Sequence, residues 1–198
     1  MDHFEVFGLP RRLAIDEAEL QRRFYELSRR CHPDFHHGAP PAEQARALEA
    51  SARLNAAYRT LRDPIARIEY LVRLEEGRET KEGGAVKPQA PADLLEEMFE
   101  IQETLAEARA AGLDEETRAR LRRERERLLA RCRAEEGRLT GPLSAAWDAG
   151  DGAERPKVLE AFKQGLARRA YLLTVIDDLG QALGETEGAG ADVTHRRH

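Results

Sequence analysis

The chain has 198 residues, of which 35% are charged, yet its formal net charge is only −5 because 32 Lys and Arg nearly balance 37 Asp and Glu. Aromatic residues make up only 6%, which disfavours β-sandwiches and barrels, since their strands are rich in aromatic and β-branched residues. The small net charge excludes a simple polycation that binds nucleic acid by charge alone. The composition therefore predicts an all-α protein with charged helix surfaces.

The first predicted domain, residues 1–75, contains four short helices, of which the first covers residues 2–7. Asp16 begins the second helix, because its carboxylate can accept the free amide hydrogens of a first turn, and this helix continues to residue 31. A third helix begins near Pro41, and Asp63 ends it and starts the fourth. Helical spacing predicts the buried sides of the second and fourth helices: Leu20, Phe24, Leu27 and Cys31, then Ile65, Ile68, Leu71 and Val72.

Residues 76–91 hold three Gly and two Pro with few apolar residues, which predicts a linker. Three longer helices are predicted after it, over residues 93–111, 115–136 and 154–183, and they indicate an antiparallel three-helix bundle over residues 92–183. Three residues are predicted to break the chain after the second of these helices: Gly137, Gly141 and Pro142. Residues 184–198 are Gly-rich and polar, and they are predicted to form a flexible tail.

The tripeptide His32-Pro33-Asp34 stands where the second helix, which carries several arginines, is predicted to end. On its own this tripeptide is only a helix stop, because the proline ends the helix and the aspartate begins a turn. The next helix ends in a second pattern, Leu54-Asn55-Ala56-Ala57-Tyr58-Arg59-Thr60-Leu61-Arg62-Asp63-Pro64. The two patterns together favour a functional motif over a chance helix stop.

A helix, an HPD tripeptide and a second helix ending in NxAYxxLxDP resemble the J-domain. Two further runs resemble more specifically the HscB family, the J-domain co-chaperones of iron–sulfur cluster assembly. These runs are Asp2-His3-Phe4-Glu5-Val6-Phe7-Gly8-Leu9-Pro10 and Arg67-Ile68-Glu69-Tyr70-Leu71. The resemblance covers residues 1–75 and extends more weakly through the predicted bundle.

The resemblance implies that the HPD loop and the basic face of the preceding helix bind a DnaK/HscA-type ATPase chaperone and stimulate its ATP hydrolysis. The residues it assigns to this chaperone contact are His32, Pro33, Asp34, Arg23 and Arg29. Guanidinium groups on a stiff helix suit an acidic partner, because charge steers association and sets the register. No nucleophile stands beside His32 in the sequence and no phosphate-binding Gly-rich loop occurs, so the chain is predicted not to be an enzyme and to need no cofactor.

Metal binding by His32, His36 and His37 is disfavoured, because Pro33 prevents His32 and His36 from sharing a helical face. The two cysteines, Cys31 and Cys132, form no CxxC pair and are predicted to be reduced thiols in a cytoplasmic protein. No apolar run approaches the roughly 20 residues that span a bilayer, so no membrane contact is predicted.

On a helical wheel the first bundle helix has a core stripe, an opposite acidic stripe, and Leu95 and Phe99 between them. The core stripe consists of Leu94, Met98, Ile101, Leu105 and Ala108, and the acidic stripe of Glu96, Glu100, Glu103 and Glu107. Leu95 and Phe99 either widen the core face or, beside a stripe of one charge sign, form a surface that binds a partner.

The resemblance favours the second interpretation, because in HscB-like proteins this helix binds the scaffold protein on which the iron–sulfur cluster is built. The matching positions are Leu95, Phe99, Glu100, Glu103 and Glu107. Tyr171 is a further candidate for scaffold binding: it is predicted to lie opposite the main apolar face of the last helix, either exposed or in a second buried face.

Residues 118–133 contain eight arginines, which is the best argument for nucleic-acid binding. Because no aromatic residue stands among them to stack on bases, we favour a solvated face that pairs across the bundle with the acidic helix. The predicted function is an adaptor that brings a scaffold client to an ATPase chaperone. The alternatives are a J-domain protein with another client, and a nucleic-acid-binding or structural helical protein in which the HPD tripeptide is incidental.

Overall fold

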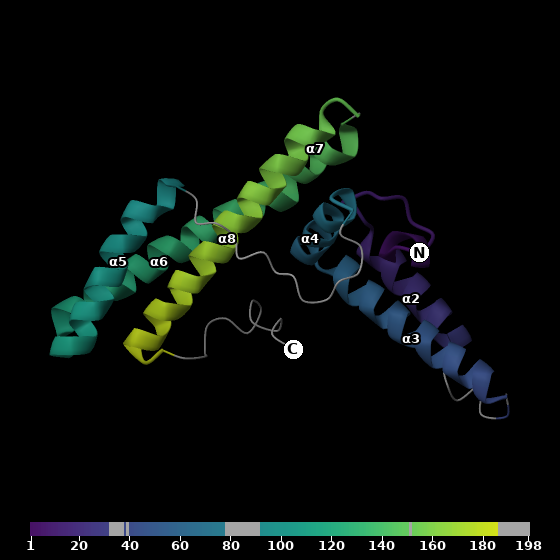
Figure 1. Ribbon diagram of the computed structural model, residues 1–198, viewed down its shortest axis with the longest axis horizontal. Coiled ribbons are helices and arrows are strands. Elements are labelled where there is room, and N and C mark those ends of the chain that lie inside the picture. Colours follow the sequence, from purple (N-terminus) through teal and green to yellow (C-terminus); the bar gives the residue numbers. More distant parts are fainter. Residues whose placement is uncertain (32–37, 39, 78–91, 151, 186–198) are drawn as a thin grey trace. The chain divides into compact units, whose positions relative to one another are not determined.

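The computed structural model describes residues 1–31, 38, 40–77, 92–150 and 152–185. Every regular element in these residues is helical, which confirms the all-α prediction (Figure 1). The chain divides into two compact units, Met1–Glu82 with Arg138–Lys163, and Gly83–Gly137 with Gln164–His198. Among the described helices, none combines the length and the apolar character needed to cross a membrane.

The first unit begins with four helices: α1 (His3–Val6), α2 (Glu17–Cys31), α3 (Pro41–Arg62) and α4 (Pro64–Glu75). Asp16 caps α2 as predicted, since its carboxylate accepts hydrogen bonds from the amides of Ala18 (2.9 Å) and Glu19 (3.2 Å). Asp63 caps α4 in the same way, through the amides of residues 65 and 66. These local caps explain why the sequence already indicated where both helices begin.

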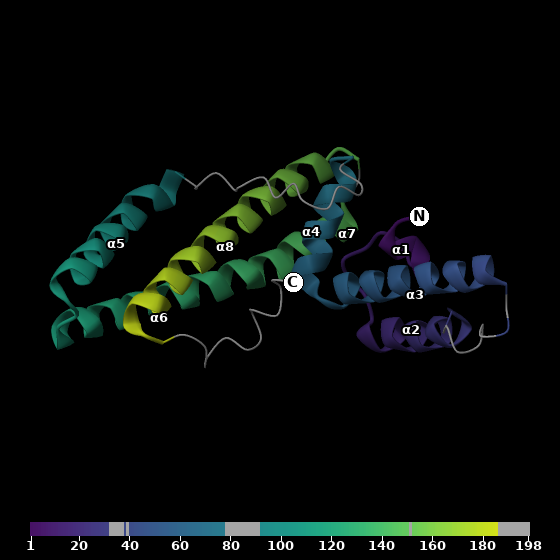
Figure 2. The same cartoon turned by 60° about the horizontal axis from the view of Figure 1, so that its bottom comes forward.

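Helices α2 and α3 lie side by side (Figures 1 and 2). Helices α1 and α4 both pack against α3. The ring of Phe24 on α2 stacks on Tyr58 of α3, with 4.1 Å between ring centroids. All four apolar residues predicted for the buried side of α4 are buried. The core beneath them also contains Phe4, Leu20, Leu54, Ala57 and Leu61.

The segment between α1 and α2 is held from two sides. Arg67, a buried residue of α4, donates hydrogen bonds from its guanidinium to the carbonyls of Leu61 (2.8 Å) and Leu13. Burial lowers the pKa of Arg67, and the negative charges of nearby Glu17 and Asp148 oppose that shift. On the other side, the two Asp148 carboxylate oxygens accept hydrogen bonds from the amides of Leu13 (2.8 Å) and Ala14 (2.7 Å).

Asp148 belongs to a compact turn that the sequence did not predict. The helix α6 (Glu115–Arg138) passes directly into a π-helical segment, η2 (Leu139–Leu143), and then into α7 (Ser144–Ala149). The prediction that Gly137, Gly141 and Pro142 break the chain there was wrong, because each lies inside a helix. Pro142 has no backbone N–H to donate within this segment, and burial of Leu139 and Trp147 stabilises this turn.

This turn closes the core of the first unit. Trp147 is 2% exposed; its ring centroid lies 6.3 Å from that of Phe162, and the Arg155 guanidinium lies 5.1 Å above the indole. The ammonium of Lys163 lies 3.4 Å from the carboxylate of Glu76. Residues 138–163, which we predicted within a separate bundle over residues 92–183, therefore pack as one compact unit with the four N-terminal helices.

The second unit consists of α5 (Ala92–Ala111) with most of α6 and the C-terminal part of α8 (Arg155–Leu183). Its buried core is contributed by all three helices: Leu94, Ile101 and Leu105; Leu121, Leu128 and Cys132; and Leu172, Val175, Ile176, Leu179 and Leu183. Arg169 on α8 forms an ion pair with Glu136 on α6, with 2.6 Å between the guanidinium Nε and the carboxylate oxygen. Of the predicted core stripe of α5, the side chains of Met98 and Ala108 lie outside the described residues.

The two cysteines differ in burial. Both are free thiols; Cys132 is buried in the second unit, and Cys31 is half-buried at the end of α2. Burial raises the pKa of Cys132 to about 11, and the negative charge of Glu136 adds to this shift. At about pH 8 this thiol therefore carries almost no reactive thiolate.

We accordingly expect iodoacetamide at about pH 8 to label Cys31 in the native protein and to spare Cys132 until denaturant is added, as measured by peptide mass spectrometry. A Cys31→Ser variant serves as the control, since its native form should take up no label. Equal labelling of both thiols in the native protein would contradict the burial of Cys132.

Candidate partner-binding surfaces

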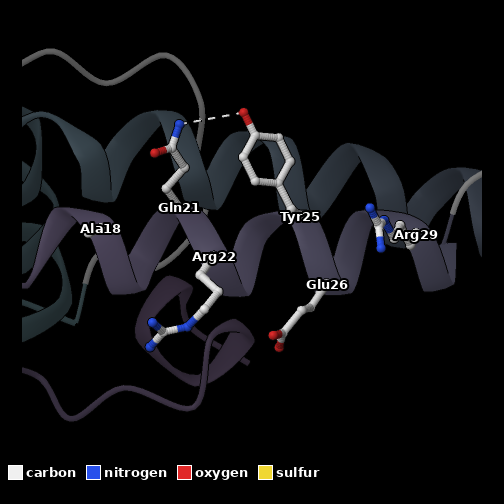
Figure 3. A pocket seen from close by; sticks show the side chains of 6 residues that line it. All are labelled: Ala18, Gln21, Arg22, Tyr25, Glu26 and Arg29. Atoms are coloured by element: carbon white, nitrogen blue, oxygen red, sulfur yellow. Dashed lines mark hydrogen bonds between the residues drawn. The ribbon is translucent and has the colours of Figure 1, made fainter.

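The outward face of α2 carries exposed side chains around a shallow surface pocket (Figure 3). This face consists of Ala18, Gln21, Arg22, Tyr25, Glu26 and Arg29, all of them exposed. Tyr25 is 56% exposed, and its hydroxyl oxygen accepts a hydrogen bond of 3.5 Å from the Gln21 amide. Arg22 and Arg29 lie about two helical turns apart, so the face presents two guanidinium groups on either side of an aromatic ring.

Arg23, which we predicted on the docking face, points elsewhere. Its guanidinium donates hydrogen bonds to the carbonyl oxygens of Phe7 (2.6 Å) and Gly8 (3.1 Å), and it pairs with Glu19 on α2 at 2.5 Å. These three partners belong to the same unit, so Arg23 holds the end of α1 against α2. Its role in chaperone binding stays a prediction, whereas Arg29 is exposed as expected.

Sequence reasoning missed Arg22 and Tyr25 on this face, although a signal was present. On a wheel centred on Leu20, which is buried, Arg22 and Arg29 lie opposite the core, whereas Arg23 lies on the flank. His32, Pro33 and Asp34 lie outside the described residues; in the sequence they follow directly after Cys31, the last residue of α2.

Helix α5 of the second unit leaves two large apolar side chains in solvent. Phe99 is 73% exposed and Leu95 is 51% exposed, whereas Leu94, Ile101 and Leu105 of the same helix are buried. The structure thus contradicts the interpretation in which Leu95 and Phe99 widen the core face. Exposed apolar surface of this kind on a charged helix is typical of sites that bind another protein.

The acidic stripe beside these residues is open to solvent. Glu100, Glu103 and Glu107 are exposed, and no Lys or Arg in the described part of the chain forms an ion pair with any of them. The side chain of Glu96 lies outside the described residues. Three uncompensated carboxylates favour a partner with a positively charged surface.

The predicted pairing of the α6 arginines with this acidic stripe is wrong for the described side chains. Arg122 pairs with Glu185 (2.8 Å), Arg127 with Glu124 within α6 (2.5 Å), and Arg120 donates to the hydroxyl of Thr104 (2.8 Å). The reason is geometric: Thr104 lies on the α6 side of α5, while the glutamates lie on the side away from the core.

Tyr171 on α8 is half-buried and packs against the core of the second unit. Of the two alternatives, a second buried face on α8 agrees better with this position than a fully exposed ring does. Part of the ring still borders solvent, so a contribution of Tyr171 to scaffold binding stays a prediction.

Comparison with known proteins finds similarity to J-domain proteins and to co-chaperones. Residues 2–70 match the family model of the DnaJ domain. The co-chaperone protein HscB homolog of Ralstonia nicotianae is 39% identical over 110 residues, which are 56% of this chain and only 61% of that protein. The human co-chaperone protein HscB has the same fold, with a TM-score of 0.61 and 25% identity over 91% of this chain and 81% of that chain. The chain is therefore similar to HscB proteins over most of its length, and its N-terminal part matches the DnaJ domain.

A second HscB structure is similar over nearly the full length of the relative. The chaperone HscB from Vibrio cholerae matches with a TM-score of 0.54 and 25% identity, covering 90% of this chain and 99% of that one. The DnaJ-domain match covers α1, α2, α3 and part of α4, and the HPD tripeptide lies within the matched sequence.

Proposed function

We propose that this protein is a co-chaperone with two binding surfaces. The outward face of α2 and the HPD tripeptide after it bind a DnaK/HscA-type ATPase chaperone and stimulate its ATP hydrolysis. Helix α5 binds an iron–sulfur cluster scaffold protein and so brings this client to the chaperone at a high effective concentration. The protein acts by binding, in the cytoplasm, where its two free thiols fit a reducing compartment.

The observation that supports scaffold binding by α5 is the exposure of Leu95 and Phe99. Exposed apolar side chains change the stability of the free protein little. They contribute strongly to the free energy of binding once a partner covers them. The uncompensated glutamates of the same helix add selectivity for a basic partner. The HscB relatives, whose names describe chaperones and co-chaperones, supply the class of the second partner.

The test is a single-turnover ATPase assay with the cognate chaperone, in the presence and absence of the scaffold protein. We expect wild type to accelerate hydrolysis and the scaffold to increase that effect. The double variant Arg22→Ala, Arg29→Ala should lose roughly tenfold in chaperone affinity at low salt, because it removes two cations from the docking face. His32→Gln should abolish the stimulation.

The matched control is Arg46→Ala, Arg59→Ala, which changes the charge equally at two exposed positions of α3. This control should stimulate as wild type does. An inert wild-type protein, or equal losses in both double variants, would contradict the chaperone half of the proposal. A scaffold that wild type does not bind would instead favour a J-domain protein with a different client.

A further inference from the structure

Within the second unit, a hydrogen bond joins α8 to α5, the helix that carries the exposed apolar residues. The two helices run in the same direction (Figures 1 and 2), and the Gln102 amide of α5 donates a hydrogen bond of 3.2 Å to the Asp178 carboxylate of α8. This hydrogen bond sets which sides of the two helices face each other. Gln102 and Asp178 therefore mark the line where the two surfaces meet.

Helical spacing places the other residues along this line. Leu95, Phe99 and Gln102 follow one another on the α8 side of α5 at steps of four and three positions. Tyr171 and Asp178 are seven positions apart on the α5 side of α8, as Leu95 and Gln102 are on their helix. Since the helices are parallel, the apolar end of the line holds Leu95 and Tyr171, and the polar end holds Gln102 and Asp178.

The carboxylate of Asp178 is half-exposed and has spare hydrogen-bonding capacity. Gln102 supplies one hydrogen bond to one of its oxygens, and no Lys or Arg among the described residues forms an ion pair with it. A carboxylate can accept several hydrogen bonds and gains most from a cationic donor. Asp178 thus adds a fixed negative charge beside the exposed apolar side chains.

We infer that Asp178 pairs with a Lys or Arg of the scaffold protein when apolar side chains of the same scaffold segment cover Leu95 and Phe99. This inference rests on the proposed function, because the scaffold is the partner it concerns. The partner segment then has apolar side chains followed, roughly 10 Å further along α5 and α8, by a cation, since seven helical residues span that length.

The test compares Asp178→Asn with Asp177→Asn by titration calorimetry against the scaffold protein. Asparagine keeps the shape of the side chain and can still accept the hydrogen bond from Gln102, so the change removes only the charge. Asp177 is the matched control, because it is an exposed acid about 100° away around α8. We expect Asp178→Asn to weaken binding roughly fivefold to tenfold at low salt and to flatten its salt dependence.

Asp177→Asn should change the affinity less than about twofold, and Asp178→Glu, which retains the charge, should bind more tightly than Asp178→Asn. If Asp178→Asn binds as wild type does while truncation of Leu95 and Phe99 removes binding, the role of Asp178 is overturned and the proposed function stands. If the titration of wild type with the scaffold protein gives no heat of binding, the proposed function itself is overturned.

Discussion

The double variant Leu95→Ala, Phe99→Ala is expected to bind the scaffold protein at least about 100-fold more weakly than wild type, a loss of about 3 kcal/mol. Leu95 and Phe99 are 51% and 73% exposed in the free protein, so at least half of the surface of each residue is available for burial against a partner. Large apolar anchors of this kind carry most of the binding free energy in protein interfaces.

The fold should survive this change, because neither side chain belongs to the core of the second unit. Thermal unfolding should therefore match wild type, and stimulation of the chaperone ATPase in the absence of scaffold should persist. Leu48→Ala is the matched control, since Leu48 is a 62% exposed apolar residue of α3. A double variant that binds within about threefold of wild type would contradict α5 as the client surface.

Asp148→Ala is expected to lower the free energy of unfolding by about 2–4 kcal/mol, because it removes two charge-assisted hydrogen bonds and leaves the amides of Leu13 and Ala14 without their acceptor. It also removes a negative charge that favours the buried guanidinium of Arg67. The segment before α2 then loses one of the two contacts that hold it, and the loss is expected to loosen the position of α2.

Denaturant unfolding measures this loss, and hydrogen exchange at the amides of residues 13 and 14 localises it. Asp177→Ala is the control, since it removes an exposed acid of α8 whose carboxylate accepts a long hydrogen bond of 3.4 Å from Gln181. A change below about 0.5 kcal/mol in Asp148→Ala, the size expected for an ordinary surface substitution, would show that the two hydrogen bonds do not stabilise the J-domain.

Local features were predicted correctly because they depend on neighbouring residues. The caps at Asp16 and Asp63 and the buried side of α4 follow from hydrogen-bond geometry and helical spacing within one or two turns. Helical spacing also predicted correctly that the acidic stripe of α5 faces solvent, because the positions that share a helical face are set by local geometry.

The turn before α8 was mispredicted because tertiary packing outweighed local signals. Gly141 and Pro142 favour a break in an isolated chain, yet burial of Leu139 and Trp147 keeps this stretch helical. The same limit applies to Arg23: its arginine-rich surroundings suggested a docking role, whereas its hydrogen bonds to Phe7 and Gly8 depend on where α1 packs.

The sequence by itself determined the class of this protein: its helices, the residues that share each helical face, and the HPD and NxAYxxLxDP patterns that mark a J-domain. Only the tertiary structure decided which faces stay open to partners, because the covering of a face depends on distant segments. Exposure of Phe99 and the contact of Asp148 with Leu13, 135 positions apart, are long-range facts of this kind. Helical periodicity carries information over a few turns, whereas packing joins residues at any separation.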